Sequence, residues 1–235
     1  MSDNNFDLIV IGAGPGGYHA AIRGAQLGLT VAIVEKDDGS GIGGLGGVCL
    51  NWGCIPTKAL LKSAEVFNYL NHAEDYGLKA EKVDKDFDAV VKRSRDVAGG
   101  MSKGVQFLMK KNKIDVINGY GKIRPDKVVD VDGIEYQANH IVIATGARSR
   151  ILPIIPQDGK KIFGYREAMN LPKQPKKLII VGSGAIGVEF AYFYNSLGTK
   201  VTIVEYLPNL VPLEDHEISK ELEKSFKKRG INVMT

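Results

Sequence analysis

Two segments of the chain repeat one pattern of apolar and small residues. In the first, a short apolar run at residues 6–11 leads directly into a glycine-rich turn at residues 12–17. An alanine-rich stretch with helical spacing follows as far as Gly28, and a second apolar run at residues 31–34 ends at Glu35. The pattern therefore predicts a strand, a tight turn, a helix and a second strand that ends in an acid.

The same order of features returns in the second half of the chain. An apolar run at residues 178–181 leads into a turn at residues 182–187, and a helical pattern continues to Gly198. The apolar run at residues 201–204 then ends at Glu205, and the spacing from the first glycine to the acid equals that of the first copy. Repetition of strands, turn, spacing and acid predicts two sites of matching geometry.

Each element of this pattern has a role in binding a dinucleotide. Gly12 makes the turn, Gly14 lets a pyrophosphate approach the backbone, and Gly17 lets the helix pack against the strand. The acid, Glu35, can accept hydrogen bonds from the ribose hydroxyls. Because no arginine or lysine directly follows Glu205 to receive a 2′-phosphate, the second site is expected to prefer NAD(H) over NADP(H).

The remaining pattern completes an α/β chain. Further helices are predicted over residues 56–71, 87–111, 165–169 and 214–229, and further strands over 114–117, 141–144 and 231–234. Gly99 and Gly100 are a candidate break in the second of these helices. The β-branched runs and glycines up to residue 136 predict a small meander, and residues 141–144 a buried strand. The glycine-rich segment 36–47 predicts a surface loop without chemistry of its own.

The predicted fold class is therefore α/β, with two Rossmann-like dinucleotide-binding domains and a small β-meander in the first. Prolines between residues 153 and 175 indicate a linker, so the domains are expected over residues 1–150 and 151–235. The second domain is expected to be incomplete, because the chain stops where another strand opens. We expect the sequence to be a fragment of a longer protein.

Charge and composition narrow the function classes. The 31 basic and 27 acidic residues give a net charge of +4 and are interspersed, which argues against a nucleic-acid partner. No apolar run approaches the roughly 20 residues of a membrane span, so no membrane association is expected. The first five residues lack the features of a secretory signal. A cytoplasmic location is the expectation.

The only two cysteines, Cys49 and Cys54, have four residues between them, and the two glycines before Cys49 and the one before Cys54 permit a tight loop. Pro56 suits the first turn of a helix, so Cys54 is expected at a helix N-terminus, where a thiolate is stabilised. Lys58 would share its helix face and add to that stabilisation. These features favour a redox dithiol. A structural disulfide, two inert buried thiols, or a zinc site that recruits His72 are the alternatives, and no metal site is predicted.

The two fingerprints around a C-x-x-x-x-C-x-P-x-K core resemble the flavin-dependent pyridine nucleotide-disulfide oxidoreductases. The most specific match runs from Cys49 to Leu60, and the likeness spans the whole chain. Segments 144–146 and 182–189 agree with it. Trp52 departs from the pattern, because relatives usually carry a smaller or more flexible residue there, and a packed loop aromatic is its simplest role.

The resemblance implies FAD in the first domain and NAD in the second. The implied catalytic residues are Cys49, Cys54, Lys58 and Glu189. The implied FAD-binding residues are Gly12, Gly14, Pro15, Gly17, Glu35, Lys36, Gly47, Val48, Cys49, Cys54, Lys58, Gly121, Ala144, Thr145 and Gly146. The implied residues of the NAD site are Gly182, Gly184, Ala185, Ile186, Gly187, Glu189 and Glu205.

The resemblance also implies an activity. Within the family, the sequence most resembles the members that oxidise protein-bound dihydrolipoyl groups with NAD⁺. Cys49 would exchange with the substrate dithiol, Cys54 would lie against the isoalloxazine ring, and Lys58 would lie near flavin N5 with Glu189. The base in this family is a histidine of a C-terminal dimerisation domain of the other subunit, which none of the four histidines of this chain matches. The 235 residues alone are therefore expected to be nearly inactive.

The implied partners are the lipoyl-bearing acyltransferase of 2-oxoacid dehydrogenase complexes or the glycine cleavage carrier protein, with a homodimer for the full-length protein. Two alternatives stay open. One is a member of the same family that reduces glutathione or mercuric ion, although glutathione reduction would favour basic residues after Val204. The other is a non-catalytic flavin-binding module with an inert cysteine pair.

Overall fold

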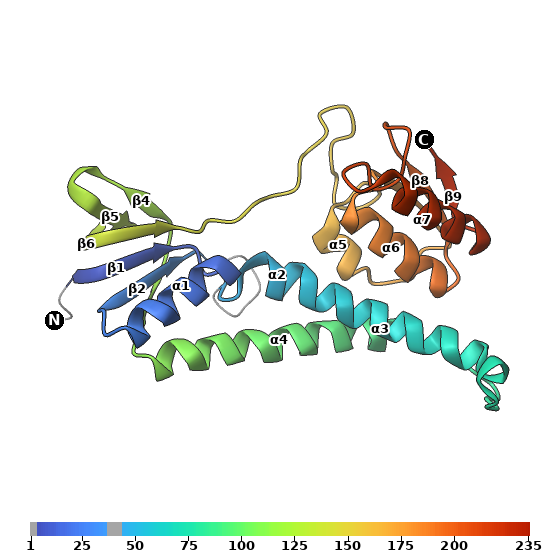
Figure 1. Ribbon diagram of the computed structural model, residues 1–235, viewed down its shortest axis with the longest axis horizontal. Coiled ribbons are helices and arrows are strands. Elements are labelled where there is room, and N and C mark those ends of the chain that lie inside the picture. The colour runs from blue at the N-terminus through green and yellow to red at the C-terminus, as the bar shows by residue number, and fades with distance from the viewer. Residues whose placement is uncertain (1–3, 37–43) are drawn as a thin grey trace. The chain divides into compact units, whose positions relative to one another are not determined.

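The computed structural model describes residues 4–36 and 44–235, and Figure 1 shows the order of its elements. Residues 37–41, the polar part of the predicted surface loop, lie outside the described residues. The chain forms two compact units, each made of two separate stretches. The first contains the chain up to Pro56 together with Arg95–Ile154, and the second contains Thr57–Ser94 and Ile155–Thr235. The assignment of nucleotide-binding domains to residues 1–150 and 151–235 stays a prediction.

A six-stranded sheet forms the centre of the first unit. Its strands are β1 (Asn5–Ile11), β2 (Val31–Glu35), β3 (Asp115–Asn118), β4 (Gly121–Ile123), β5 (Val128–Val131) and β6 (Ile134–Ile143). Their spatial order is β3-β2-β1-β6-β5-β4, in which β3, β2, β1 and β6 are parallel and the β4–β5–β6 meander is antiparallel. The helix α1 (Pro15–Gln26) connects β1 to β2. The predicted α/β class and the small meander are confirmed.

The strand β6 corrects one detail of the sequence analysis. The end of the meander and the strand at residues 141–144 were predicted as separate elements, but one ten-residue strand covers both. Gln137 pairs with Val128 on the antiparallel side and with Asn5 on the parallel side. The prediction of a buried strand at residues 141–144 was wrong, because Ile141, Val142 and Ala144 are only half-buried and Ile143 is 67% exposed. A periodicity of two cannot reveal that one strand serves two kinds of pairing.

Two long helices each have residues in both units. They are α3 (Cys54–Asn71), followed by the short helix η1 (Ala73–Tyr76), and α4 (Phe87–Lys111). The expected break at Gly99 and Gly100 was wrong, because α4 runs through both glycines without interruption. Its buried residues Ala98, Ser102 and Val105 lie on either side of the pair. Packing of that face outweighs the roughly 1 kcal/mol by which each glycine disfavours a helix.

The second unit contains a three-stranded parallel sheet in the order β7-β8-β9, with strands Lys177–Val181, Lys200–Val204 and Asn232–Met234. Its helices are α5 (Tyr165–Met169), α6 (Ala185–Ser196) and α7 (His216–Lys228). The core gathers aromatic residues of α6, including Phe190, Phe193 and Tyr194. Leu60 and Ala64 of α3 are completely buried in the same core. The second unit therefore depends on a segment far from it in the sequence.

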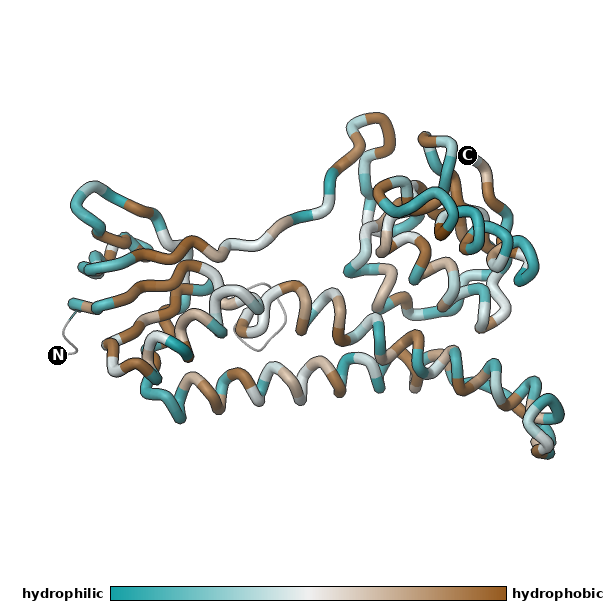
Figure 2. The backbone as a smooth tube through the Cα atoms, in the orientation of Figure 1, coloured by the Kyte–Doolittle hydropathy of each residue, from teal (hydrophilic) through white to brown (hydrophobic). Residues whose placement is uncertain are grey.

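Apolar residues follow the strands of the first unit's sheet, as Figure 2 shows. Val10 and Ile33, on neighbouring strands, are paired in register and completely buried. Burial of such side chains contributes about 1.5–3 kcal/mol each. Within residues 4–36 and 44–235, no helix combines the length and the apolar content needed to cross a membrane.

Candidate active site

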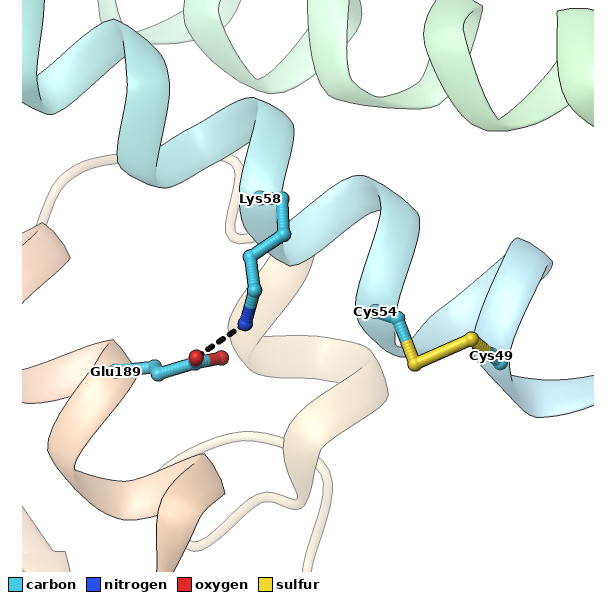
Figure 3. The surroundings of a disulfide bond; sticks show 4 residues. All are labelled: Cys49, Cys54, Lys58 and Glu189. Carbon is cyan, nitrogen blue, oxygen red and sulfur yellow. Dashed lines mark hydrogen bonds and ion pairs between the residues drawn. A yellow bond between two sulfur atoms is a disulfide. The ribbon is translucent and has the colours of Figure 1, made fainter.

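A disulfide joins Cys49 to Cys54 across the boundary of two consecutive helices (Figure 3). Cys49 lies on α2 (Gly47–Trp52), and Cys54 is the first residue of α3, as predicted. The tight loop expected around Cys49 is instead this short helix, which Gly53 separates from α3. A side chain at Gly53 would place its Cβ 2.9 Å from the Val48 carbonyl oxygen, so a glycine permits the close approach. The sulfurs are bonded to each other, so in this structure neither is a free thiol.

Polar contacts from α4 hold the segment that carries Cys49. Asn51 is completely buried and donates from Nδ2 to the Leu45 carbonyl at 3.1 Å, which also accepts the Ser102 hydroxyl at 2.6 Å. Arg95 donates from Nη2 to the Asn51 carbonyl at 2.5 Å, and its guanidinium lies 4.3 Å from the centre of the Trp52 ring. Trp52 is thus half-buried beneath a cation. Arg95 and Ser102 were missed in the sequence, because nothing local links α4 to the cysteines.

Lys58 and Glu189 form an ion pair, which brings together two side chains 131 residues apart (Figure 3). Lys58 is one turn after Cys54 on α3, and Glu189 lies near the start of α6. The side chains are 62% and 30% exposed, respectively. An ion pair of this exposure contributes at most about 1 kcal/mol to folding, so the arrangement adds little to stability. Lys58 and Glu189 therefore lie close together in the structure. Their catalytic role stays a prediction.

The first glycine-rich turn is built by close backbone approach. Gly12 has a φ of +102°, and a Cβ there would lie 2.2 Å from the Ala144 oxygen. A Cβ at Gly17 would lie 1.7 Å from the Gly12 oxygen, so both positions admit only glycine. Gly14, which caps α1 ahead of Pro15, would meet only the Gly47 Cα at 4.0 Å. The backbone at Gly14 is therefore open to a ligand.

The turn and the disulfide helix belong to one local structure. The Gly46 amide donates to the Ala13 carbonyl at 2.9 Å, and a Cβ at Gly47 would lie 2.6 Å from the Gly14 Cα. Gly47 and Val48 open α2, so the helix that carries Cys49 begins against the turn. A dinucleotide whose pyrophosphate lies on this turn would have the disulfide in the same unit.

The acid Glu35 and the ends of two other strands complete the first candidate site. Glu35 ends β2, accepts the Ala13 amide at 2.5 Å and accepts the amide of Lys36 at 3.1 Å. Gly121 opens β4, where a Cβ would lie 3.2 Å from Val34 Cγ1 and press against the sheet. The other predicted residues, Ala144, Thr145 and Gly146, directly follow β6. With an open turn at a helix N-terminus and an acid beside it, these residues fit the adenosine diphosphate part of FAD.

The second turn has the same construction. Gly182 has a φ of +97°, and a Cβ at Gly187 would lie 2.2 Å from the Gly182 oxygen. A Cβ at Gly184 would meet nothing within 4 Å, and the helix α6 starts directly after it with Ala185 and Ile186. Glu205 follows β8 and accepts the Ser183 amide at 2.8 Å. The residues therefore fit a second dinucleotide.

The pKa of Glu205 reflects two opposing effects. Partial burial raises the pKa of its carboxyl, but hydrogen bonds from Leu207, Ser183 and Tyr206 outweigh that effect and hold the pKa below its ordinary value. The carboxylate is thus ionised at neutral pH. Tyr206, the next residue, is 98% exposed and carries no positive charge, which would suit a ribose with free hydroxyls better than a 2′-phosphate.

Among the described residues, none of the four histidines lies on α2 or α3, the helices that carry the cysteines. All four are exposed. His19 contacts the Pro15 carbonyl oxygen one turn earlier on α1, and His72, directly after α3, contacts the Asn68 carbonyl oxygen. Throughout the part of the chain that the structure describes, no group of three or more His, Cys, Asp or Glu side chains could hold a metal ion.

Two glycine-rich turns, each with an acid at a strand end, and a disulfide at a helix N-terminus are the combination expected of a class of flavoenzyme. The chain belongs to the pyridine nucleotide-disulphide oxidoreductase family, which it matches over residues 6–235. It is 51% identical to the dihydrolipoyl dehydrogenase of Zymomonas mobilis over 240 residues, covering 100% of this chain and 50% of that protein. It is 50% identical to the dihydrolipoyl dehydrogenase of Rhizobium etli, covering 98% of this chain and 51% of the relative.

A solved structure supports the same family. The HOCl-induced flavoprotein disulfide reductase RclA from Escherichia coli superimposes with a TM-score of 0.81 at 28% identity. The match covers 97% of this chain and 48% of that one. The chain spans about half the length of these curated relatives and of this structure.

Proposed function

We propose that the chain is the flavin- and nucleotide-binding half of a dihydrolipoyl dehydrogenase that oxidises protein-bound dihydrolipoamide with NAD⁺. The observation that carries the proposal is the Cys49–Cys54 disulfide, whose Cys54 is exposed at the start of α3. A disulfide that closes so small a ring removes little chain entropy, so structural stabilisation is a poor reason for it. The identity to proteins named dihydrolipoyl dehydrogenase supports the choice of substrate.

The proposed reaction at the cysteines is thiol–disulfide exchange. A dihydrolipoamide thiolate attacks Sγ of Cys49, the Cys49–Cys54 bond breaks, and Cys54 leaves as a thiolate. The second lipoyl thiolate then attacks the lipoyl sulfur of the mixed disulfide, which closes the lipoamide ring and releases Cys49. The substrate loses two electrons and two protons. The cysteine pair gains the two electrons, and the protons pass to the base and the solvent. A Cys54 thiolate at a helix N-terminus is a good leaving group because the helix dipole stabilises its charge.

FAD, when bound, supplies the two-electron transfer between the cysteine pair and NAD⁺. The proposed FAD-binding residues are those of the first turn, Glu35, the start of α2, Gly121 and the segment after β6. Gly14 would take the pyrophosphate on the N-terminus of α1, and Glu35 would accept the ribose hydroxyls. The Lys58–Glu189 pair would place a fixed cation at the end of the Lys58 side chain, one turn from Cys54.

The second turn would bind NAD in the same manner, through Gly184 and Glu205. The remaining elements of the proposal are a homodimer, a lipoyl-bearing acyltransferase or the glycine cleavage carrier protein as partner, and a cytoplasmic location. The 235 residues alone are proposed to be nearly inactive with dihydrolipoamide, because the base expected from the family resemblance is a histidine of a dimerisation domain that none of the four histidines matches.

The test uses the full-length polypeptide purified with its flavin. NADH formation from dihydrolipoamide and NAD⁺ is expected for the wild type, and both Cys49→Ser and Cys54→Ser should lower kcat by at least about a thousandfold, because neither variant can form the disulfide. Replacement of Ser196, a buried hydroxyl of α6 remote from the cysteines in sequence, by alanine is the matched control and should retain activity.

Glutathione disulfide with NADPH and Hg²⁺ with NADPH are the competing substrate pairs. Faster turnover with either pair than with dihydrolipoamide would reject the proposed substrate. Full flavin content without any of the three activities would favour the non-catalytic module.

A further inference from the structure

The two glycine-rich turns differ in their second residue, where Ser183 stands in place of Ala13. Ser183 is completely buried. Its amide donates to Oε2 of Glu205 at 2.8 Å, and its hydroxyl donates to the same oxygen at 2.7 Å. In the first turn the corresponding Ala13 can offer Glu35 only its amide. The carboxylate of the second site is therefore held by one more donor from its turn.

The same hydroxyl also contacts the segment that follows β8. The Val211 amide donates to the Ser183 carbonyl at 3.1 Å and to its Oγ at 3.2 Å. Val211 has a φ of +41°, a conformation that β-branched residues rarely adopt and that costs about 1–3 kcal/mol. Such a backbone persists only where surrounding contacts hold it, and the neighbouring Leu210 is completely buried.

Glu205 closes the arrangement from its other oxygen. Oε1 accepts the Leu207 amide at 3.0 Å, so the carboxylate is fixed on one side by Ser183 and on the other by the segment after β8. Ser183 thus joins the acid and Val211 through a single hydroxyl that donates to one and accepts from the other. Fixing a charged group before the ligand arrives lowers the cost of binding.

We propose that Ser183 is a positioning residue for nucleotide selection, whose hydroxyl fixes the Glu205 carboxylate so that a ribose with a free 2′-hydroxyl is favoured over a 2′-phosphate. The inference rests on the proposed function, because it takes the second turn to bind the adenosine half of NAD(H). A fixed carboxylate accepts the ribose hydroxyls in good geometry and repels a 2′-phosphate at close range. Without the Ser183 hydroxyl, the carboxylate keeps only its backbone amide donors and is held less firmly, which weakens both effects.

The experiment measures binding by calorimetry in the full-length protein, with ADP-ribose and 2′-phospho-ADP-ribose as probes that cannot be turned over. In Ser183→Ala the Kd for ADP-ribose should rise about tenfold, as expected for loss of a hydrogen bond to a charged group. The Kd for 2′-phospho-ADP-ribose should stay within about twofold of wild type or fall, because repulsion is relieved as contacts are lost. The ratio of the Kd for 2′-phospho-ADP-ribose to the Kd for ADP-ribose should therefore be smaller in Ser183→Ala than in the wild type.

A pH series gives a readout that general loosening would not produce. The Ser183 hydroxyl stabilises the ionised form of Glu205, so its removal should raise the pKa of that carboxyl. The affinity for ADP-ribose falls as the acid becomes protonated. In Ser183→Ala this fall should therefore begin at a higher pH than in the wild type.

Ser196→Ala is the matched control, since the Ser196 hydroxyl is buried and has no hydrogen-bond partner among the described residues. It should bind both probes as the wild type does. An equal loss of affinity for both probes in Ser183→Ala, or no loss for either, overturns the inference while the NAD site stands. A wild-type protein that binds neither probe rejects the proposed NAD site and the inference with it.

Discussion

At the residue scale, the two glycine-rich turns depend on positions where a side chain has no room. Gly12 and Gly17 would each bring a Cβ within 2.2 Å of a backbone oxygen, whereas the glycines of α4 face open space. The sequence pattern of strand, glycines and acid was sufficient to predict these turns, because every feature it needs is local. The two kinds of glycine cannot be told apart by composition, and only the contacts separate them.

Replacement of Gly12 and of Gly100 by alanine should have opposite effects on stability. Gly12→Ala combines a left-handed φ with a clash against the Ala144 oxygen, and should lower the free energy of unfolding by at least about 2 kcal/mol. Gly100→Ala adds a helix-favouring residue in open space and should raise it by about 0.5–1 kcal/mol. Urea unfolding followed by circular dichroism measures both. A stable Gly12→Ala variant would contradict the described turn.

The contacts of polar side chains were the least predictable features at this scale. The pairing of Lys58 with Glu189 could be expected only through the family resemblance, since the two residues are 131 positions apart. Arg95 against Trp52 and the hydroxyl of Ser183 against Glu205 carried no sequence signal. Such contacts depend on how elements pack, which hydrophobic periodicity does not encode.

At the scale of elements, the sequence predicted where strands and helices occur better than it predicted whether each one is continuous. The helix α4 has its predicted bounds but lacks the candidate break at Gly99 and Gly100, and the strand β6 was expected as two elements but is unbroken. In α4, tertiary packing overrides the propensity of two glycines, and in β6 the change from antiparallel to parallel pairing at Gln137 needs no change in the strand itself. The short helix α2 was missed because six residues that begin with Gly47 and directly follow Gly46 give no helical period.

The N-terminus of α7 provides a test of an element boundary. Asp215 caps this helix, and its Oδ1 accepts the Glu217 amide at 2.8 Å. Asp215→Ala should lower the free energy of unfolding by about 1 kcal/mol, since a side-chain cap is lost. The preceding residue, Glu214, contributes only its backbone amide to the turn, so Glu214→Ala is the control and should change stability by less than about 0.5 kcal/mol. Equal thermal shifts in the two variants would count against the cap.

At the scale of the whole molecule, each compact unit is made from two stretches of chain. The aromatic core of α6 includes Leu60 and Ala64, and Phe87 and Val90 of α4 pack against it. The proline-rich stretch around residues 153–175 predicted a simple division of the chain. It could not show that residues 57–94 complete the second unit, because that packing joins residues distant in sequence.

A fragment of residues 155–235 tests this dependence. Without the α3 and α4 segments, its core would be exposed, so the fragment should bind a hydrophobic dye and unfold without a cooperative transition. Addition of a peptide of residues 57–94 should reduce the dye signal, whereas the same peptide with Leu60→Asp should not. Cooperative unfolding of the fragment alone, at the stability of the intact chain, would show that α3 is dispensable.

The burial of Leu60 against residues of α6 also has a consequence for synthesis on the ribosome. The Lys58–Glu189 pair shows that α3 and α6 meet across 131 positions, and a nascent chain grows by about 5–20 residues per second. For on the order of ten seconds, therefore, α3 has left the exit tunnel before its packing partners are translated. During that interval its apolar face is exposed to chaperones and to aggregation. Pauses in translation between α3 and α6 should therefore lower the yield of folded protein more than pauses after Gly198.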